Sequence, residues 1–374
     1  MRPARAAISA ATLVLLLVVA GCEQAPPAAE RTADVAIPVS IDTLPVLVIL
    51  DTIPEGEPRL LLPTGATMLS NGNIVVSDQW ASAVRFFDPS GNLVRTVGRS
   101  GEGPGEFAAP WWLGQCGPDA VFVWDYMQSQ MSVLDSAGTV VREYNPEKGP
   151  SIFRCTRSGR FAVVGTPLNV PRSLGELFTT RVSAPLRLED SSGDSVGGVG
   201  IIPGYESSIL GRITQYALTD ERLYVGTADS AFLDIYNLDG DRLGTLPLSI
   251  APRAPTEANV ERWLDAQWET FNDTEYRRWG KEMTRQRSQV PEHLPLYTGL
   301  AVDPEGVVWV VLSSPGDGET RFHAVAPDGT FLADLRIPTE LKLYEVGRDY
   351  LLGLIHGNND IPGIALYRLH RGSR

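Results

Sequence analysis

The feature that most constrains the fold of this chain is a phrase that returns at a nearly constant interval. Asp78 ends one short apolar run and Asp125 ends the next, 47 residues further on. A turn glycine recurs in the same way, at Gly91, Gly138, Gly193, Gly240 and Gly329, with spacings of 47, 55, 47 and 89 residues. Self-similarity at such a period indicates a stack of repeated supersecondary units. The interval of 89 residues is one repeat plus an insertion, which is visible at 255–293.

Each repeat predicts four short strands, with a turn at Asn-Gly or a related pair after the first strand and a turn at Asp-Gly or Ser-Gly after the third. Four strands with a period in the forties are typical of a β-propeller blade. We expect an all-β, six-bladed propeller over residues 36–374, with blades at 60–98, 110–145, 150–200, 212–249, 296–338 and 341–370. The last blade has only three predicted strands. We expect the apolar run 46–50 to supply its outer strand and close the ring, which removes the exposed sheet edges.

The N-terminus predicts export. Arg2 and Arg5 precede an apolar stretch at 10–20, which is too short to span a bilayer but suits a signal peptide. The following Val-Ala-Gly-Cys22 resembles the lipobox of bacterial lipoproteins, in which the cysteine is acylated and becomes the mature N-terminus. The alternative is an ordinary secretory signal. We therefore expect a signal peptide at 1–21, a flexible Pro/Ala-rich tether at 22–35, and a membrane of the bacterial cell envelope as a partner through Cys22, on a periplasmic or outer-membrane face.

The net charge and the cysteines limit the partners and the cellular compartment that we expect for this protein. The formal net charge is −13, and removal of Arg2 and Arg5 with the signal makes it −15, which argues against nucleic acid as a partner. Once Cys22 is acylated, Cys116 and Cys155 remain. Both lie late in predicted inner strands of neighbouring blades, and an exported protein meets oxidising conditions, so we expect them to form a disulfide. Two buried free thiols are the alternative.

A glycine-rich segment at 97–110, together with 76–78 and 84–88, resembles the NHL repeat. The resemblance is good over 68–112, weaker over 113–145, and only a general blade pattern afterwards. Ala81-Ser82-Ala83 stands where NHL repeats commonly have Asn-His-Arg. The chain as a whole resembles exported bacterial six-bladed propeller proteins. The resemblance implies the architecture, and a fold alone does not specify a function.

The loops of the predicted propeller differ between its two faces. On one face, the short-turn face, the chain turns in a few residues. On the other, the long-loop face, the connections are long, at 98–110, 166–178, 197–212, 250–296, 313–321 and 356–362. Insertions concentrated on one face of a repeat protein usually mark its binding side. Our candidates for ligand binding are Asp78, Arg99, Trp112, Asp125, Tyr126, Arg172, Trp268, His293 and His356.

The largest insertion predicts two helices. Val260, Leu264 and Trp268 recur at helical spacing, Thr256 can cap the first helix, and a second begins near 272–273. We interpret the aromatic residues of this insertion as docking the helices onto the rim of the propeller. The alternative is a lid over the central channel.

Two functions fit the sequence. In the first, a non-catalytic module without cofactor or metal binds a small molecule or a protein on the long-loop face. In the second, Asp78 and Asp125 hold a metal on the axis, as acidic residues do in some lactonase-type propellers, and the protein is a lyase or hydrolase. We favour the first because Asp at a strand end commonly accepts backbone N–H bonds. In addition, the histidines lack metal-ligand spacing and no nucleophile motif is present. A purely structural envelope protein is a third possibility.

Overall fold

The structure is a computed structural model that describes residues 39–49, 60–146, 152–178, 180–268, 271, 273–313, 316–357 and 361–372. The chain divides into two units, Met1–Val35 and Ala36–Arg374, and all described residues belong to the second. The predicted signal peptide, the tether and Cys22 therefore lie outside the described residues. Among the described residues, no helix combines the length and the apolar character needed to cross a membrane.

Six antiparallel sheets confirm the predicted propeller. Blades 1 and 2 consist of β3 (Pro63–Met68), β4 (Ile74–Asp78), β5 (Ala83–Phe87) and β6 (Leu93–Val97), and of β7 (Pro110–Gln115), β8 (Val121–Asp125), β9 (Gln130–Leu134) and β10 (Val140–Tyr144). Blades 3 and 4 consist of β11 (Ile152–Cys155), β12 (Phe161–Val164), β13 (Arg181–Glu189) and β14 (Ser195–Glu206), and of β15 (Gln215–Leu218), β16 (Leu223–Gly226), β17 (Phe232–Tyr236) and β18 (Arg242–Pro247). Blade 5 consists of β19 (Tyr297–Val302), β20 (Val308–Leu312), β21 (Thr320–Val325) and β22 (Phe331–Ile337).

The sixth blade closes the ring. It contains β23 (Lys342–Val346), β24 (Tyr350–His356) and β25 (Pro362–Arg371), and its outer edge is completed by strands from the start of the unit. β2 (Leu47–Ile49) pairs antiparallel with β25 with Val48 opposite Ala365, which confirms the prediction for 46–50. A further strand, β1 (Val39–Ile41), pairs with the C-terminal end of β25 and was not predicted.

The inner strands of successive blades contact one another in the order β3, β7, β11, β15, β19 and β23, and β23 contacts β3. Between each pair of neighbouring blades lies one cluster of buried apolar side chains. Because both faces of a blade are covered by its neighbours, the second strands of blades 1 to 4 are buried along their whole length instead of alternating. Every residue of β4 and of β8 is buried. The apolar layers between the blades therefore hold the ring together.

A recurrent turn connects the third strand of a blade to the fourth. In blades 1 to 4, an Asp or Asn ends the third strand region, and its Oδ1 accepts bonds from the N–H groups two and four residues further on. These residues are Asp88, Asp135, Asp190 and Asn237. The glycine three places after each has a positive φ, which a residue with a side chain rarely adopts. This is the physical basis of the repeated glycine seen in the sequence.

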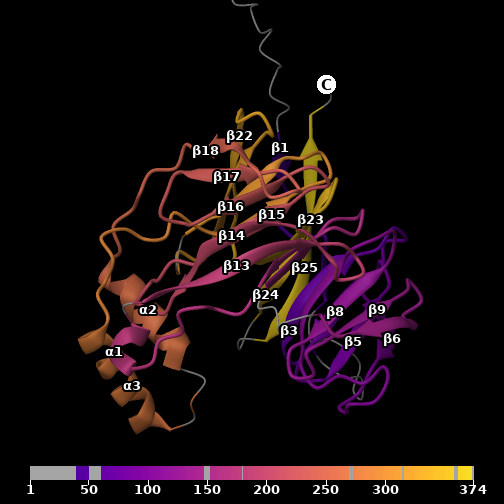
Figure 1. Ribbon diagram of the computed structural model, residues 1–374, viewed down its shortest axis with the longest axis horizontal. Helices are drawn as coiled ribbons and strands as arrows, with labels where there is room; N and C mark the ends of the chain where they lie inside the picture. The colour runs from indigo at the N-terminus through magenta and orange to yellow at the C-terminus, as the bar shows by residue number, and fades with distance from the viewer. Residues whose placement is uncertain are drawn as a thin grey trace, which may run out of the picture. The chain divides into compact units, whose positions relative to one another are not determined.

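The insertion between blades 4 and 5 is helical, as predicted. It contains α2 (Glu257–Trp268) and α3 (Thr274–Arg287), and a short helix, α1 (Leu174–Leu177), lies in blade 3. Thr256 and Asn259 cap α2 reciprocally, and Asp273 caps α3. Figure 1 shows the helices at one end of the view and β1 with the C-terminus at the other.

The helices dock on the rim of the propeller. Val260 and Leu264 pack against Ile209, Leu210 and Leu294, which belong to the connections flanking blade 4. The N–H of Ile209 donates to Ser288 Oγ just after α3 (2.7 Å). These contacts agree with the docking interpretation of the insertion.

Cys116 and Cys155 form the predicted disulfide, with a Cα–Cα distance of 5.4 Å. It joins the ends of the inner strands of blades 2 and 3 at the short-turn face. Cys116 is buried within the apolar layer between these blades, where it packs near Phe122 and Phe161. The bridge therefore links two neighbouring blades covalently at the axis.

We expect the C116S/C155S double variant to lose about 4 kcal/mol of unfolding free energy, because the bridge closes a long loop and restricts the unfolded chain. Urea unfolding of the variant and of wild type, each with and without reductant, measures the loss. Reductant should destabilise wild type and leave the variant unchanged. A variant as stable as oxidised wild type would contradict a stabilising role for the bridge.

Candidate functional site

A cavity of about 1420 Å³ lies on the axis of the propeller. All six inner strands contribute to its wall, together with turn residues of the short-turn face and loop residues of the long-loop face. We call it the axial cavity. Typical small-molecule pockets have volumes of about 300–1,000 Å³. The axial cavity therefore has room for a ligand together with water.

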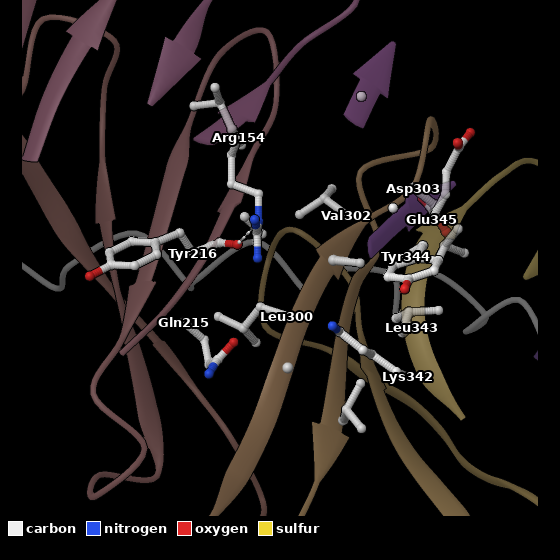
Figure 2. A pocket seen from close by; sticks show the side chains of 18 of the residues that line it. Arg154, Gln215, Tyr216, Leu300, Val302, Asp303, Lys342, Leu343, Tyr344 and Glu345 are labelled. Atoms are coloured by element: carbon white, nitrogen blue, oxygen red, sulfur yellow. Dashed lines mark hydrogen bonds between the residues drawn. The ribbon is translucent and has the colours of Figure 1, made fainter. Parts of the chain in front are cut away.

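Part of the wall is apolar. Leu300 and Val302 of β19 and Leu343 of β23 line one region of the axial cavity, beside Tyr344 (Figure 2). On the side of blade 2, Trp112 lines the wall and packs against Phe153 with ring centroids 5.3 Å apart. Apolar walls with a few polar groups are typical of ligand sites in proteins.

Four cationic residues belong to the wall, Arg154, Arg157, Arg222 and Lys342, and Arg157 lies 3.8 Å from Glu345. Figure 2 shows Arg154 of β11 and Lys342 of β23 with their charged ends directed into the same space beside Leu300. They come from blades 3 and 6, which stand opposite each other in a ring of six. Arg154 donates from Nε to the carbonyl of Tyr216 (3.1 Å) and from Nη1 to its neighbour Phe153 (2.8 Å). Burial lowers the pKa of the Arg154 guanidinium. Burial and, secondly, the charge of Arg154 lower the pKa of the Lys342 ammonium.

The carboxylates near the short-turn face already have partners. Glu345 accepts from Thr67 Oγ1, from the Tyr350 hydroxyl and from the N–H of Met68 (3.2 Å), which joins blade 6 to blade 1. Asp303 accepts from Trp309 Nε1 (2.8 Å) and pairs with Arg371. These acids hold neighbouring parts of the ring together, and their oxygens are engaged by the protein itself.

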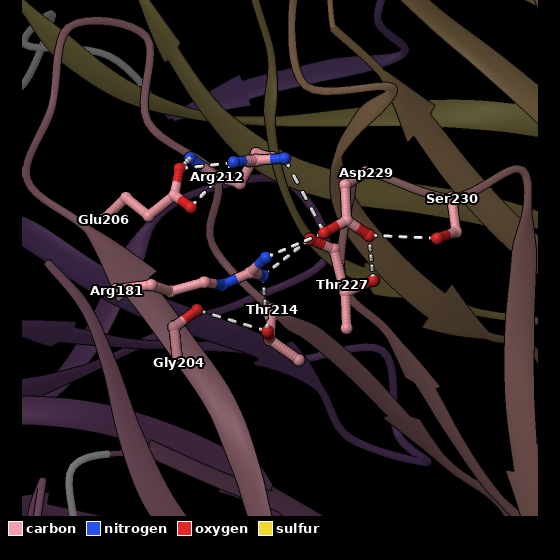
Figure 3. A network of polar contacts seen from close by, with 8 residues as sticks. All are labelled: Arg181, Gly204, Glu206, Arg212, Thr214, Thr227, Asp229 and Ser230. Carbon is pink, nitrogen blue, oxygen red and sulfur yellow. Dashed lines mark hydrogen bonds and ion pairs between the residues drawn. The ribbon is translucent and has the colours of Figure 1, made fainter. Parts of the chain in front are cut away.

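Cations on the long-loop face are balanced too (Figure 3). Arg181 contacts Asp229 at 3.0 Å, and Arg212 contacts Glu206 through two nitrogens at 3.0 and 2.9 Å. Burial alone would raise the pKa of Asp229, but hydrogen bonds from Thr227 and Ser230 and the two arginines lower it below its ordinary value. This network ties the connection between blades 3 and 4 to the loop after β16 and leaves no excess charge.

Asp78 and Asp125 support the loops that enter their own blades. Asp78 accepts from the N–H groups of Leu61 and Leu62 (3.0 and 2.9 Å) and pairs with Arg85 at 3.1 Å. The Asp125 carboxylate accepts four backbone N–H bonds of 2.7–3.0 Å, from the residues Ala108, Ala109, Met127 and Gln128. Both side chains are buried. This arrangement is the backbone-capping role that the sequence favoured.

Three other candidates are surface residues, two of them in the long loops and Tyr126 in the short connection between β8 and β9. Arg99 is exposed and pairs with Glu106 inside the glycine-rich loop (2.7 Å). Tyr126 is exposed after β8. The backbone N–H of Arg172 donates to Glu176 at the start of α1 (2.8 Å). None of the three lines the axial cavity among the described residues.

The last four candidates separate into two pairs. Trp268 packs against α3, where its Nε1 donates to Thr284 Oγ1 (3.1 Å), and His293 lies beside Glu292 at 3.8 Å. Neither lines the axial cavity, nor does any other described residue of 255–293, so the lid alternative gains no support. Trp112 and His356 do line it, from blades 2 and 6.

Sequence reasoning missed Arg154 and Lys342. The signal was present, because both lie in predicted inner strands, where a charged side chain lies close to the axis. Arg154 directly precedes Cys155, and Lys342 is the second residue of the predicted strand 341–346. The candidates from the sequence lie mainly in the long loops and at strand ends, whereas Arg154 and Lys342 lie within inner strands.

No family model matches the sequence, and no curated protein matches it significantly. Among solved structures, a Bacteroides fragilis protein predicted to be exported shares the fold with a TM-score of 0.53 and 12% identity, over 91% of this chain and 97% of its own. A member of the DUF4221 family from Bacteroides vulgatus has a TM-score of 0.52 and 12% identity, over 90% of this chain and 99% of its own. A catalytically inactive virginiamycin B lyase from Staphylococcus aureus has a TM-score of only 0.40 and 11% identity, over 84% of this chain and 82% of its own. The two Bacteroides structures support the propeller fold and leave the activity open.

We expect D125A to cost about 3 kcal/mol of unfolding free energy, because it removes a buried carboxylate that accepts four backbone N–H bonds, one buried and three partly buried. D194A, which removes an exposed carboxylate of blade 3, is the control and should change stability by less than about 0.5 kcal/mol. Urea unfolding at neutral pH measures both. If D125A were as stable as D194A, the carboxylate would not be a structural cap.

Proposed function

We propose that this protein is a cell-envelope binding module that takes a small-molecule ligand into the axial cavity from the long-loop face. The observation that carries the proposal is the cavity itself, a space of about 1420 Å³ bounded by six rigid inner strands. Sites built on strands hold their side chains more precisely than sites on loops. A ligand in this position contacts several blades at once.

The residues do not fit the alternative, a metal-dependent lyase or hydrolase that uses Asp78 and Asp125. Their carboxylates are buried away from the axial cavity and accept backbone N–H bonds. Within the described part of the chain, no group of three or more His, Cys, Asp or Glu is placed to hold a metal ion. Binding without chemistry is the function that the geometry supports best.

We also infer that the protein is exported and held to the envelope by a lipid on Cys22. Two observations support export: the apolar signal with its lipobox, and the Cys116–Cys155 bridge, since disulfides persist in oxidising compartments. We further assign blades 1 and 2 to the NHL type. In support, the glycine-rich loop folds back through a bridge between Ser100 and Phe107, and Phe107 fills the apolar layer between these blades.

We expect T298W to block ligand entry. Thr298 lies in β19 on the wall of the axial cavity with its side chain exposed, so a large indole fills space there without disturbing the core. The measurement is the thermal shift produced by a library of small metabolites. A compound that raises the Tm of wild type should lose that effect in T298W.

The matched control is V141W, which places the same indole on the outer strand β10, where Val141 is exposed. It should keep the response of wild type. Ligands that stabilise T298W as well as they stabilise V141W would place the binding site elsewhere.

We expect C22S to abolish acylation. Wild type expressed in a bacterial host should incorporate labelled palmitate and sediment with membranes, whereas C22S should do neither. The C116S/C155S variant, which keeps Cys22, serves as control and should still be labelled. Labelling of C22S, or wild type recovered free in the periplasm, would refute the anchor.

A further inference from the structure

The charges of the axial cavity carry more information than its volume. Three buried or half-buried arginines are paired with acids: Arg85 with Asp78 (3.1 Å), Arg181 with Asp229 (3.0 Å), and Arg371 with Asp303. Arg154 and Lys342 differ. Among the described residues, no carboxylate lies within 4 Å of either charged group. Glu340, which also lines the cavity, is only two residues from Lys342 and makes no ion pair with it.

Arg154 and Lys342 face the same space of the axial cavity (Figure 2). Arg154 is half-buried, whereas Lys342 is exposed in the cavity, with its Nζ 5.6 Å from the centroid of the Tyr344 ring. Burial and, secondly, the charge of Arg154 lower the pKa of Lys342, which agrees with two cations that face one space. The protein has a net charge of −13, yet no described carboxylate pairs with either cation. Two cations in one cavity without an acidic partner are the arrangement that an anionic ligand would complete.

We propose that the axial cavity binds a small organic anion, whose carboxylate or phosphate group lies between Arg154 and Lys342 and whose apolar part packs against Leu300 and Val302. This inference rests on the proposed function of the cavity and names the class of its ligand. Arg154 offers the planar donor geometry that suits carboxylate and phosphate, and its two backbone hydrogen bonds hold it in place. Lys342 supplies a second charge from the opposite wall.

The test uses hexanoate as the probe and hexanamide as its neutral analogue, with inorganic phosphate as a probe of the charged group alone. Binding is measured by calorimetry on the full mature protein at constant ionic strength, because exposed charges are screened by salt. Hexanoate should bind saturably, and hexanamide at least about tenfold more weakly, as expected when a charge-assisted hydrogen bond is lost.

Variants locate the site. K342Q and R154Q should each weaken hexanoate binding about tenfold or more. K281Q and R99Q remove the same charges elsewhere, from an exposed pair with Asp265 and from the pair with Glu106, and should stay within about twofold of wild type. Equal binding by K342Q and K281Q would overturn the inference.

Stability separates a binding role from a structural one. In anion-free buffer, K342Q should keep a Tm close to that of wild type, because Lys342 is exposed and makes no ion pair or hydrogen bond among the described residues, and lies only over the Tyr344 ring (5.6 Å to its centroid). A marked fall in Tm would show that Lys342 supports the fold and would overturn the inference. R154Q can lose its bonds to Tyr216 and Phe153, so K342Q decides this point.

Chemical acetylation of lysine side chains reports independently on where the ligand binds. The chain has three lysines, Lys148, Lys281 and Lys342, so each is resolved by mass spectrometry. Hexanoate should slow acetylation of Lys342 and leave Lys281 unchanged. If hexanamide binds as well as hexanoate and T298W abolishes both, the cavity binds ligands but the anion inference fails. If neither hexanoate nor phosphate binds, the anion inference also fails, while the metabolite screen with T298W decides the proposed function separately.

Discussion

Closure of the ring at blade 6 is the interaction on which the rest of the structure depends. β2 and β1 pair with β25, so the first strands of the unit complete the last blade. Without this pairing β25 would be an open edge, and each apolar layer would depend only on neighbours in sequence. Contacts at the same seam add to the pairing, since Tyr344 donates to the carbonyl of Pro63 and Glu345 accepts from Thr67 and Met68. The axial cavity exists because the ring is closed.

The blades could be predicted from the sequence because they are encoded locally. A positive-φ glycine and the Asp or Asn three residues before it define a turn without reference to the rest of the chain, and they recur at Gly91, Gly138, Gly193 and Gly240. The disulfide could be predicted for a related reason, since the two cysteines occupy equivalent places in neighbouring repeats. β1 was missed because three residues carry no periodicity, and only β25 gives them a partner.

The site could be predicted only in part, because it is assembled from distant blades. Trp112 and His356 were among the candidates from the sequence, and both line the axial cavity. Asp78 and Asp125 stood out for their repetition, but repetition in a propeller reflects a structural need that every blade shares. A binding residue is expected to break the repeat, as Arg154 and Lys342 do. The two side chains face the same cavity because a ring of six blades places blades 3 and 6 opposite each other.

The position of β1 shows at which face the chain enters the propeller. Val39 lies opposite Arg371, beside the turn at 347–349, and therefore at the short-turn face. A lipid on Cys22 would connect there through 17 residues, a span of at most about 60 Å when fully extended. If the proposed anchor and the proposed entry from the long-loop face both hold, the tether joins the propeller on the face opposite the mouth of the axial cavity, so the lipid anchor would not compete with the ligand for the same surface.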